Sequence, residues 1–176
     1  MDYIEKTVQK NYVYQGKIIN LRCDDAELPN GKPCKREIIE HSGGSCVLYI
    51  KENKVLLVKQ FRYAYGESLY EIPAGKLEKG EEPILAAARE LEEEAGVKAK
   101  DLQLLYVMYP TPGYTNEKIY IYQAFDGENV ESHLDDDEFL DVVYLPLEEV
   151  KRMMQDGEIK DGKTLIALQA YFLSQK

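Results

Sequence analysis

The sequence has no tryptophan, two histidines and three cysteines. An odd number of cysteines without the paired short spacing of a zinc site predicts reduced thiols. His41 and His133 lack a second nitrogen ligand at metal-binding spacing, so we interpret both as structural or solvent-exposed. No apolar run approaches the ~18 residues that cross a bilayer, and residues 1–10 lack the apolar core of a signal peptide. These absences argue against secretion and membrane spanning and predict a cytoplasmic protein.

Positive charge is also scarce. Lys and Arg total 22 against 32 Asp and Glu, which gives a formal net charge of −10. Without a basic field, neither a nucleic-acid backbone nor an anionic membrane surface is an expected partner. A small anionic substrate would need the charge of a metal ion and a few local arginines. The 176 residues are 44% hydrophobic, which is enough to bury the core of one domain with a small appendage.

A helix is predicted over residues 83–95. This stretch is rich in alanine and leucine and begins with a proline, and Gly96 follows it. These features are typical of a helix with a proline in its first turn and a glycine C-cap. Its expected apolar face consists of four residues at helical spacing: Leu85, Ala88, Leu91 and Ala95.

Three carboxylates project from another face of this helix. Glu90, Glu93 and Glu94 stand at i, i+3 and i+4, where like charges repel. No positive residue follows Arg89 until Lys98. The pattern alone leaves two interpretations open. The carboxylates form either a solvated acidic face or a set of hard oxygen ligands for Mg²⁺ or Mn²⁺.

The remaining chain predicts short strands and helices. Residues 3–41 predict three or four antiparallel strands with turns at Gly16 and Gly31, a sheet too small to hold a core alone. We therefore predict two domains, residues 1–42 with this small antiparallel sheet and residues 43–176. In the second domain, alternating strand and helix patterns predict an α/β fold in which helices cover both faces of a mixed sheet.

The stretch from residue 75 to residue 97 resembles the Nudix hydrolase box, G-x5-E-x7-R-E-U-x-E-E-x-G-U, in which U is a bulky aliphatic residue. Its fixed positions are met by Gly75, Glu81, Arg89, Glu90, Leu91, Glu93, Glu94, Gly96 and Val97. The resemblance implies a Nudix-type α/β/α sandwich that hydrolyses a nucleoside diphosphate linked to another group. It also implies that Glu90 and Glu94 bind metal. Glu93 would assist them, and Arg89 would hold the glutamates in place. Residues 71–75, EIPAG, resemble the family's E-x-P-A-G, in which the Ala74 carbonyl can complete the metal shell.

A proline-containing loop resembles the ADP-ribose pyrophosphatase branch of this family. Pro112 lies fifteen residues beyond Val97, within the sequence TPGYT. Proline fixes φ and glycine permits a tight turn, so this loop is suited to face a substrate sugar or phosphate. We expect Pro112, Gly113 and Glu117 to contact the substrate.

Two other segments resemble the same branch. Glu138, in the sequence EFLDV, is the expected general base, with Asp137 as the alternative if the register slips by one. Arg62, in the sequence QFR, is expected to bind the diphosphate through its guanidinium.

The pair Arg36-Glu37 resembles the place where family members hold the adenine, often with an aromatic residue before the glutamate. Here arginine takes that position and the chain has no tryptophan, so either Arg36 or a tyrosine is left to stack on the purine. The family often supplies this part from the other subunit. We therefore expect a homodimer.

The resemblance thus predicts Mg²⁺-dependent hydrolysis of ADP-ribose to AMP and ribose 5-phosphate, with Mn²⁺ as a substitute metal. The partner is a small nucleoside diphosphate sugar, not nucleic acid or membrane. The nearest alternative is the same chemistry on another nucleoside diphosphate sugar such as GDP-mannose. Two alternatives from other classes are a non-catalytic ADP-ribose-binding module and a purely structural domain.

Overall fold

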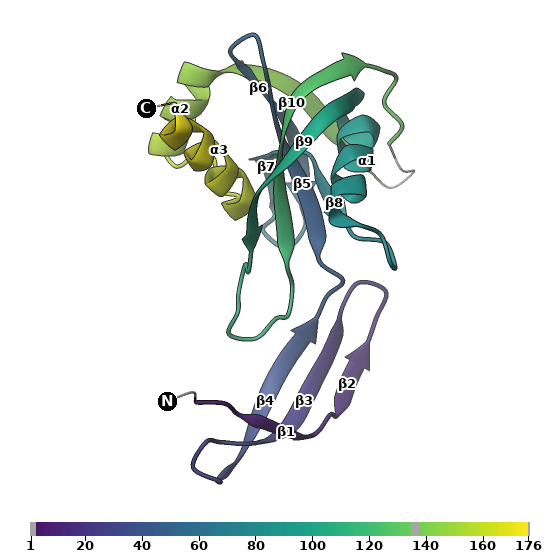
Figure 1. Cartoon of the computed structure of the whole chain (residues 1–176), viewed down its shortest axis with the longest axis vertical. Helices are drawn as coiled ribbons and strands as arrows, with labels where there is room; N and C mark the ends of the chain where they lie inside the picture. Colours follow the sequence, from purple (N-terminus) through teal and green to yellow (C-terminus); the bar gives the residue numbers. More distant parts are fainter. Residues whose placement is uncertain (1–2, 135–137, 176) are drawn as a thin grey trace. The chain divides into compact units, whose positions relative to one another are not determined.

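The computed structural model describes residues 3–134 and 138–175. The chain divides into two compact units (Figure 1): unit 1 comprises Met1–Gly43 and Tyr109–Lys118, and unit 2 comprises Gly44–Met108 and Ile119–Lys176. The predicted division into domains of residues 1–42 and 43–176 stays a prediction. Residues 109–118, which lie in the second of these ranges, group with the N-terminal sheet.

Unit 1 contains a four-stranded antiparallel sheet built on β3 (Asn20–Glu27). β4 (Pro33–Glu40) pairs along one edge of β3, while β1 (Lys6–Gln9) and β2 (Tyr12–Gln15) follow each other along the other edge. The turn between β3 and β4 contains Gly31, whose φ of 80° is in the left-handed region that favours glycine. The predicted small antiparallel sheet is confirmed.

Few apolar side chains are buried in unit 1. Because side chains alternate along a strand, Arg22, Asp24 and Ala26 of β3 turn toward one face and are buried. Among the residues described in this unit, Ala26 is the one fully buried apolar side chain, whereas Val8 and Val13 are 69% and 63% exposed. A sheet of this size does not enclose a hydrophobic core of its own.

The segment 109–118 lies along the end of β4. The backbone N–H of Ile39 donates to the carbonyl of Tyr114 at 2.7 Å, and the backbone N–H of Asn116 donates to the carbonyl of Ile39 at 3.2 Å. The side-chain oxygen of Asn116 also accepts a hydrogen bond from the backbone N–H of His41 at 2.9 Å. These bonds explain why the loop with Pro112 belongs to unit 1.

Unit 2 contains a seven-stranded sheet of order β11-β6-β5-β10-β9, in which β7 pairs with β6 and β8 pairs with β5. β5 and β10 are parallel and the other pairs are antiparallel, so the sheet is mixed. Its strands are β5 (Gly44–Lys51), β6 (Lys54–Arg62), β7 (Glu67–Glu71), β8 (Ala74–Lys76), β9 (Val97–Met108), β10 (Ile119–Asn129) and β11 (Leu140–Pro146).

Helices cover both faces of this sheet. Figure 1 shows α1 (Pro83–Ala95) on one side and α2 (Leu147–Gln155) and α3 (Gly162–Ser174) on the other. The buried residues of β5 alternate between two cores, with Leu48 in the α2 and α3 cluster and Val47 in the α1 cluster. This arrangement confirms the predicted α/β/α sandwich with a mixed sheet.

The bounds of α1 agree with the prediction, but its apolar face was partly wrong. Gly96 ends the helix in a left-handed conformation (φ 61°), as expected of a glycine C-cap. Leu85, however, is 61% exposed, whereas the fully buried apolar residues are Ala86, Ala87 and Leu91. Small alanines let the helix approach the sheet closely. The helix is turned so that Glu90 and Glu94, rather than Leu85, are buried. No helix in the described part of the chain is long and apolar enough to cross a membrane.

Candidate active site

The candidate site lies in unit 2, where the chain enters β8 beside α1. The backbone N–H of Ala74 donates to Oε2 of Glu94 at 2.9 Å. Gly75, the next residue, lies so close to α1 that an added Cβ would stand 1.8 Å from Oε1 of Glu90. The first glycine of the motif is therefore required for space beside a carboxylate.

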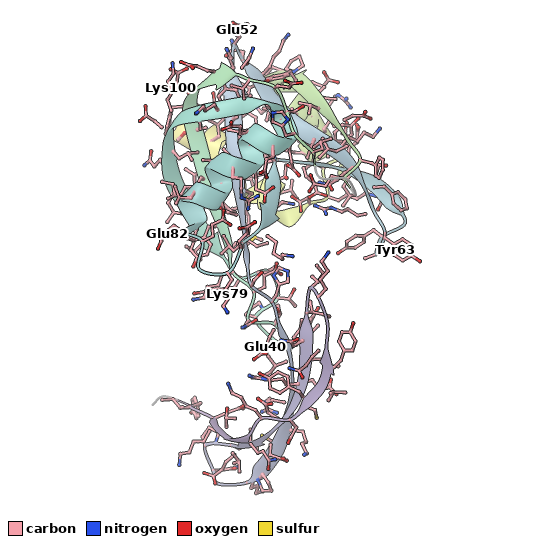
Figure 2. The ribbon with its side chains drawn as sticks, turned by 90° about the vertical axis from the view of Figure 1, so that its right-hand side faces the viewer. Glu40, Glu52, Tyr63, Lys79, Glu82 and Lys100 are labelled. Atoms are coloured by element: carbon pink, nitrogen blue, oxygen red, sulfur yellow. The ribbon has the colours of Figure 1, made fainter. Side chains whose placement is uncertain are left out.

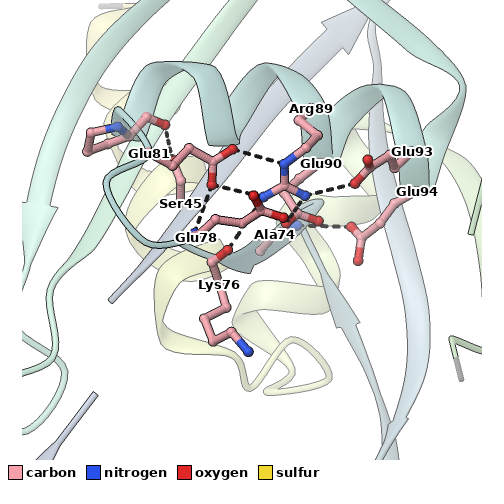
Figure 3. A network of polar contacts seen from close by, with 10 residues as sticks. Ser45, Ala74, Lys76, Glu78, Glu81, Arg89, Glu90, Glu93 and Glu94 are labelled. Atoms are coloured by element: carbon pink, nitrogen blue, oxygen red, sulfur yellow. Dashed lines mark hydrogen bonds and ion pairs between the residues drawn. The ribbon is translucent and has the colours of Figure 1, made fainter. Parts of the chain in front are cut away.

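Arg89 connects the carboxylates of the motif (Figure 3). Its Nε and Nη2 donate to the two carboxylate oxygens of Glu81 at 2.9 and 3.1 Å. Its Nη1 donates to Oε1 of Glu90 and to Oε2 of Glu93, both at 2.8 Å. One guanidinium thus orients three acidic side chains and offsets part of their mutual repulsion. The role of Arg89 in holding the glutamates for catalysis stays a prediction.

Glu90 and Glu94 are the buried acids of this group, 6% and 3% exposed. Burial raises the pKa of Glu90 to about 7 and the pKa of Glu94 to about 8. The charge of Glu138 raises both pKa values further, so Glu138 lies near these two carboxylates. Asp137 is outside the described residues.

The donor set fits a hard divalent cation. Two buried carboxylates ionise at neutral pH only with compensating positive charge, and Arg89 contacts Glu90 but not Glu94 in the structure. Carboxylate oxygens are the ligands that Mg²⁺ prefers, and Mg²⁺ normally keeps waters and substrate oxygens as its other ligands. Among the residues described, no three acidic, His or Cys side chains form a ready-made metal cage. Glu90 and Glu94 can supply two of the oxygen ligands of such an ion.

Replacing Gly75 with alanine should displace Glu90 without unfolding the protein. The new Cβ would overlap the Glu90 carboxylate, which is the far end of a flexible side chain and can move aside. We expect Mg²⁺ affinity and kcat to fall by about 10–100-fold, as for lost supporting contacts at metal sites. Isothermal titration with Mg²⁺ and steady-state kinetics measure the two effects. Gly162→Ala is the matched control, because an added Cβ there meets nothing within 4 Å. Equal behaviour of the two variants would contradict this explanation.

Without divalent metal, the Tm should fall as pH rises from about 5 to about 8. The pKa values of Glu90 and Glu94 in the folded protein lie above the ordinary value of 4.5 that applies to the unfolded chain. Between these values the folded state binds more protons than the unfolded state, so the free energy of unfolding falls as pH rises. We expect a loss on the order of 1–4 kcal/mol, or roughly 3–12 °C in Tm. Thermal unfolding in EDTA from pH 5 to 9 measures the dependence. Glu94→Gln and saturating Mg²⁺ should each flatten it; a wild-type curve parallel to that of Glu94→Gln would contradict the assignment.

Arg62 ends β6 and forms a two-point ion pair with Glu71 at the end of β7. Its Nε and Nη2 donate to the two carboxylate oxygens of Glu71, each at 2.6 Å. The hydrogen bond to Glu71 raises the pKa of Arg62, and the charge of Glu94 contributes to that shift, so Arg62 lies near the acidic site. The next residue, Tyr63, projects outward (Figure 2) and is 94% exposed.

Four of the predicted substrate-binding residues line one pocket within unit 1. Arg36 and Glu37 of β4 lie there with Pro112 and Gly113, and the pocket has a volume of about 420 Å³. Two nitrogens of Arg36 donate to the carboxylate oxygens of Glu5 at 2.6 and 2.7 Å, which holds the guanidinium plane.

Glu117 does not line this pocket. Its Oε1 lies 3.2 Å from Nδ1 of His41, on the segment that follows β4.

Sequence reasoning assigned no role to two buried residues near Arg62. Glu71 is 1% exposed and Lys163 is 8% exposed, and they form an ion pair. The signal available was Asp161, which precedes the final helix and caps it by accepting a hydrogen bond from the backbone N–H of Thr164 at 3.0 Å. That signal marks the start of a helix but does not reveal what the helix contacts.

Two family models match the chain. The NUDIX domain family matches residues 40–168, and the nucleoside diphosphate sugar hydrolase N-terminal domain matches residues 5–39. The chain therefore belongs to the Nudix family, as its motif predicted.

Two similar proteins cover nearly the whole chain. An ADP-ribose pyrophosphatase of Bacillus subtilis (strain 168) is 44% identical over 94% of this chain and 91% of its own length. A methanol dehydrogenase activator of Bacillus methanolicus is 42% identical over the same shares. A solved structure described as an ADP compounds hydrolase superposes with a TM-score of 0.85 over 97% of this chain and 93% of that chain. At 22% identity, it supports the fold alone.

Proposed function

We propose that this Nudix protein is an ADP-ribose pyrophosphatase, which uses Mg²⁺, or Mn²⁺ in its place, to hydrolyse ADP-ribose to AMP and ribose 5-phosphate. The observation that carries the proposal is the buried pair Glu90 and Glu94, held beside Ala74 and Gly75. Such a pair supplies hard oxygen ligands next to a site for an anionic substrate. The similarity to an ADP-ribose pyrophosphatase at 44% identity supports the choice of substrate.

Glu90, Glu94 and the Ala74 carbonyl would hold the ion. When bound, Mg²⁺ supplies charge that stabilises phosphate oxygens and acidifies water. Arg89 keeps Glu90 and Glu93 oriented through its two Nη1 bonds, and Glu93 assists the metal ligands.

Glu138 and Arg62 have the other roles in the hydrolysis. Arg62 directs the N–H groups that Glu71 does not use toward the diphosphate. Glu138 takes the proton from the attacking water. The water oxygen joins one phosphorus as the bond from that phosphorus to the bridging oxygen breaks, and the bridging oxygen leaves with the other phosphate.

The pocket of unit 1 is proposed to bind the nucleoside. Arg36 presents a guanidinium plane fixed by Glu5, and such a plane stacks on a purine ring. Glu37, Pro112 and Gly113 line the same pocket and supply polar and backbone contacts. Glu117 is proposed to contact the substrate from the end of the loop that contains Pro112, and its contact with His41 holds its side chain.

A homodimer is part of the proposal. Unit 1 has exposed Val8 and Val13, and β9, at the edge of the larger sheet, has Leu104 46% exposed and Tyr106 50% exposed. Apolar surface of this kind favours burial against a second copy. Light scattering after size exclusion should give about twice the 20.2 kDa of one chain. A mass of one chain across micromolar concentrations would contradict the dimer. A cytoplasmic location is proposed from the three free cysteines.

A substrate panel tests the proposed specificity. With Mg²⁺, we expect the highest kcat/KM for ADP-ribose among ADP-ribose, GDP-mannose, ADP-glucose, NADH and oxidised nucleoside triphosphates. Higher kcat/KM for GDP-mannose would move the protein to the alternative substrate class. Tight binding of ADP-ribose without product would instead indicate a non-catalytic binding module. Absence of any divalent-metal effect on Tm would indicate a purely structural domain.

A further inference from the structure

A buried cluster of charged side chains lies behind Arg62 in unit 2. Nζ of Lys163 donates to Oε2 of Glu71, the same oxygen that accepts a hydrogen bond from Nη2 of Arg62. Nζ of Lys163 also lies 3.0 Å from Oδ1 of Asp161. Two cations and two carboxylates thus alternate in this cluster, and their formal charges cancel.

The cluster is bound to the backbone that leads into the acidic site. Thr164 is fully buried, and its Oγ1 donates to Oδ2 of Asp161 at 2.6 Å and accepts from the backbone N–H of Ile72 at 2.9 Å. Ile72 stands two residues before Ala74, whose N–H contacts Glu94. The first turn of α3 therefore holds both the Glu71 side chain and the strand end that precedes Gly75.

Stability alone does not account for a buried lysine here. Replacing a buried ion pair by apolar residues of similar volume is often neutral or stabilising, because desolvation offsets the attraction between the charges. Burial acts to lower the pKa of Lys163, but Asp161 and Glu71 outweigh it and raise that pKa, so the ammonium keeps its charge. The same ammonium acts to lower the pKa of Glu94, so the cluster lies within electrostatic range of the candidate metal ligands.

We propose that Lys163 is a positioning residue for the hydrolysis, an inference that rests on the proposed function. Lys163 binds Glu71 from the interior and fixes that carboxylate against two N–H groups of Arg62. A guanidinium has five N–H groups, so three remain for a substrate phosphate. The two bonds to Glu71 come from Nε and Nη2 of Arg62, so Nη1 is not used by this ion pair. Lys163 thereby determines where Arg62 presents its free donors.

Lys163→Met tests this role, since methionine is of similar length and carries no charge. With ADP-ribose and Mg²⁺, we expect KM to rise about 10-fold or more and kcat to change only a few-fold. The contact between Arg62 and the diphosphate is present in both the bound substrate and the transition state, so its loss weakens binding more than it slows the reaction. Lys160→Met is the matched control. Nζ of Lys160 bonds Oε2 of Glu67 at 2.7 Å, so the chain has a second, exposed ion pair between β7 and the start of α3. The control should keep the wild-type KM.

A double-mutant cycle separates positioning from a purely structural role. If Lys163 acts through Arg62, then Lys163→Met added to Arg62→Met should raise KM no further than Arg62→Met alone. If the fold-increases in KM of the two substitutions multiply in the double variant, the inference is overturned. A Lys163→Met variant with the KM of wild type would overturn it as well.

A second variant keeps the test valid if Lys163→Met does not fold. Glu71→Gln preserves the shape of the side chain and removes the charge that joins Lys163 to Arg62, and it should raise KM by a similar factor. A folded Glu71→Gln variant with the wild-type KM would overturn the inference. Wild-type protein that releases no AMP from ADP-ribose would overturn the proposed function, and this inference with it.

Discussion

Glu94→Gln is expected to lower kcat for ADP-ribose by about 10³-fold while the protein stays folded. Glutamine keeps the volume of Glu94 but removes its negative charge from the metal site. A bound metal stabilises transition-state charge by several kcal/mol. Each loss of about 1.36 kcal/mol lowers the rate tenfold. Because burial raises the pKa of Glu94 to about 8, the variant should also have a higher Tm than wild type in EDTA at pH 8. Steady-state kinetics and thermal unfolding measure the two effects.

Glu92→Gln is the matched control for this substitution. Glu92 lies on the same helix, outside the fixed positions of the motif, and is half-buried. We expect its kcat to stay within a few-fold of wild type. Near-normal turnover by Glu94→Gln, or an equal loss in Glu92→Gln, would mean that Glu94 does not hold the metal.

The second large effect is expected for Glu138→Gln. A positioned general base contributes about 10²–10⁴-fold, so kcat should fall by that factor. Glu138 influences the pKa of Glu90 and Glu94. Glu138 is not one of the proposed metal ligands, so Mg²⁺ affinity and KM should change little. Single-turnover kinetics together with Mg²⁺ titration distinguish a lost base from a lost ligand.

Two controls address the assignment of the base. Glu131→Gln removes an exposed acid from the same connection between β10 and β11, and it should be neutral. Asp137→Asn tests the neighbouring acid, which lies outside the described residues. If Asp137→Asn loses kcat and Glu138→Gln does not, the base is Asp137 and the register of the resemblance is shifted by one.

Local signals in the sequence were sufficient for the helix of the motif and for its glutamates. Proline at the start and glycine after the end mark Pro83–Ala95. Proline favours the first turn of a helix and glycine the left-handed C-cap, and both effects depend only on the local backbone. The motif spacing likewise placed Glu90 and Glu94 on one face. Leu85 shows the limit of this reasoning. Periodicity predicts that a helix has an apolar face, but it does not determine which face packs against the sheet.

Contacts distant in sequence were beyond prediction. Glu71 and Lys163 stand 92 residues apart, and no composition or spacing rule connects them. The pairing of Ile39 with the segment that holds Tyr114 is similar, because it depends on how one loop meets a strand. The buried partners behind Arg62 are therefore less accessible from sequence than the carboxylates of the motif.

The most direct test of the central claim is product analysis with wild-type protein, ADP-ribose and Mg²⁺. Ion-exchange chromatography should show AMP and ribose 5-phosphate formed in equal amounts, and EDTA should abolish both. Recovery of unchanged ADP-ribose from folded, Mg²⁺-saturated protein would contradict the account.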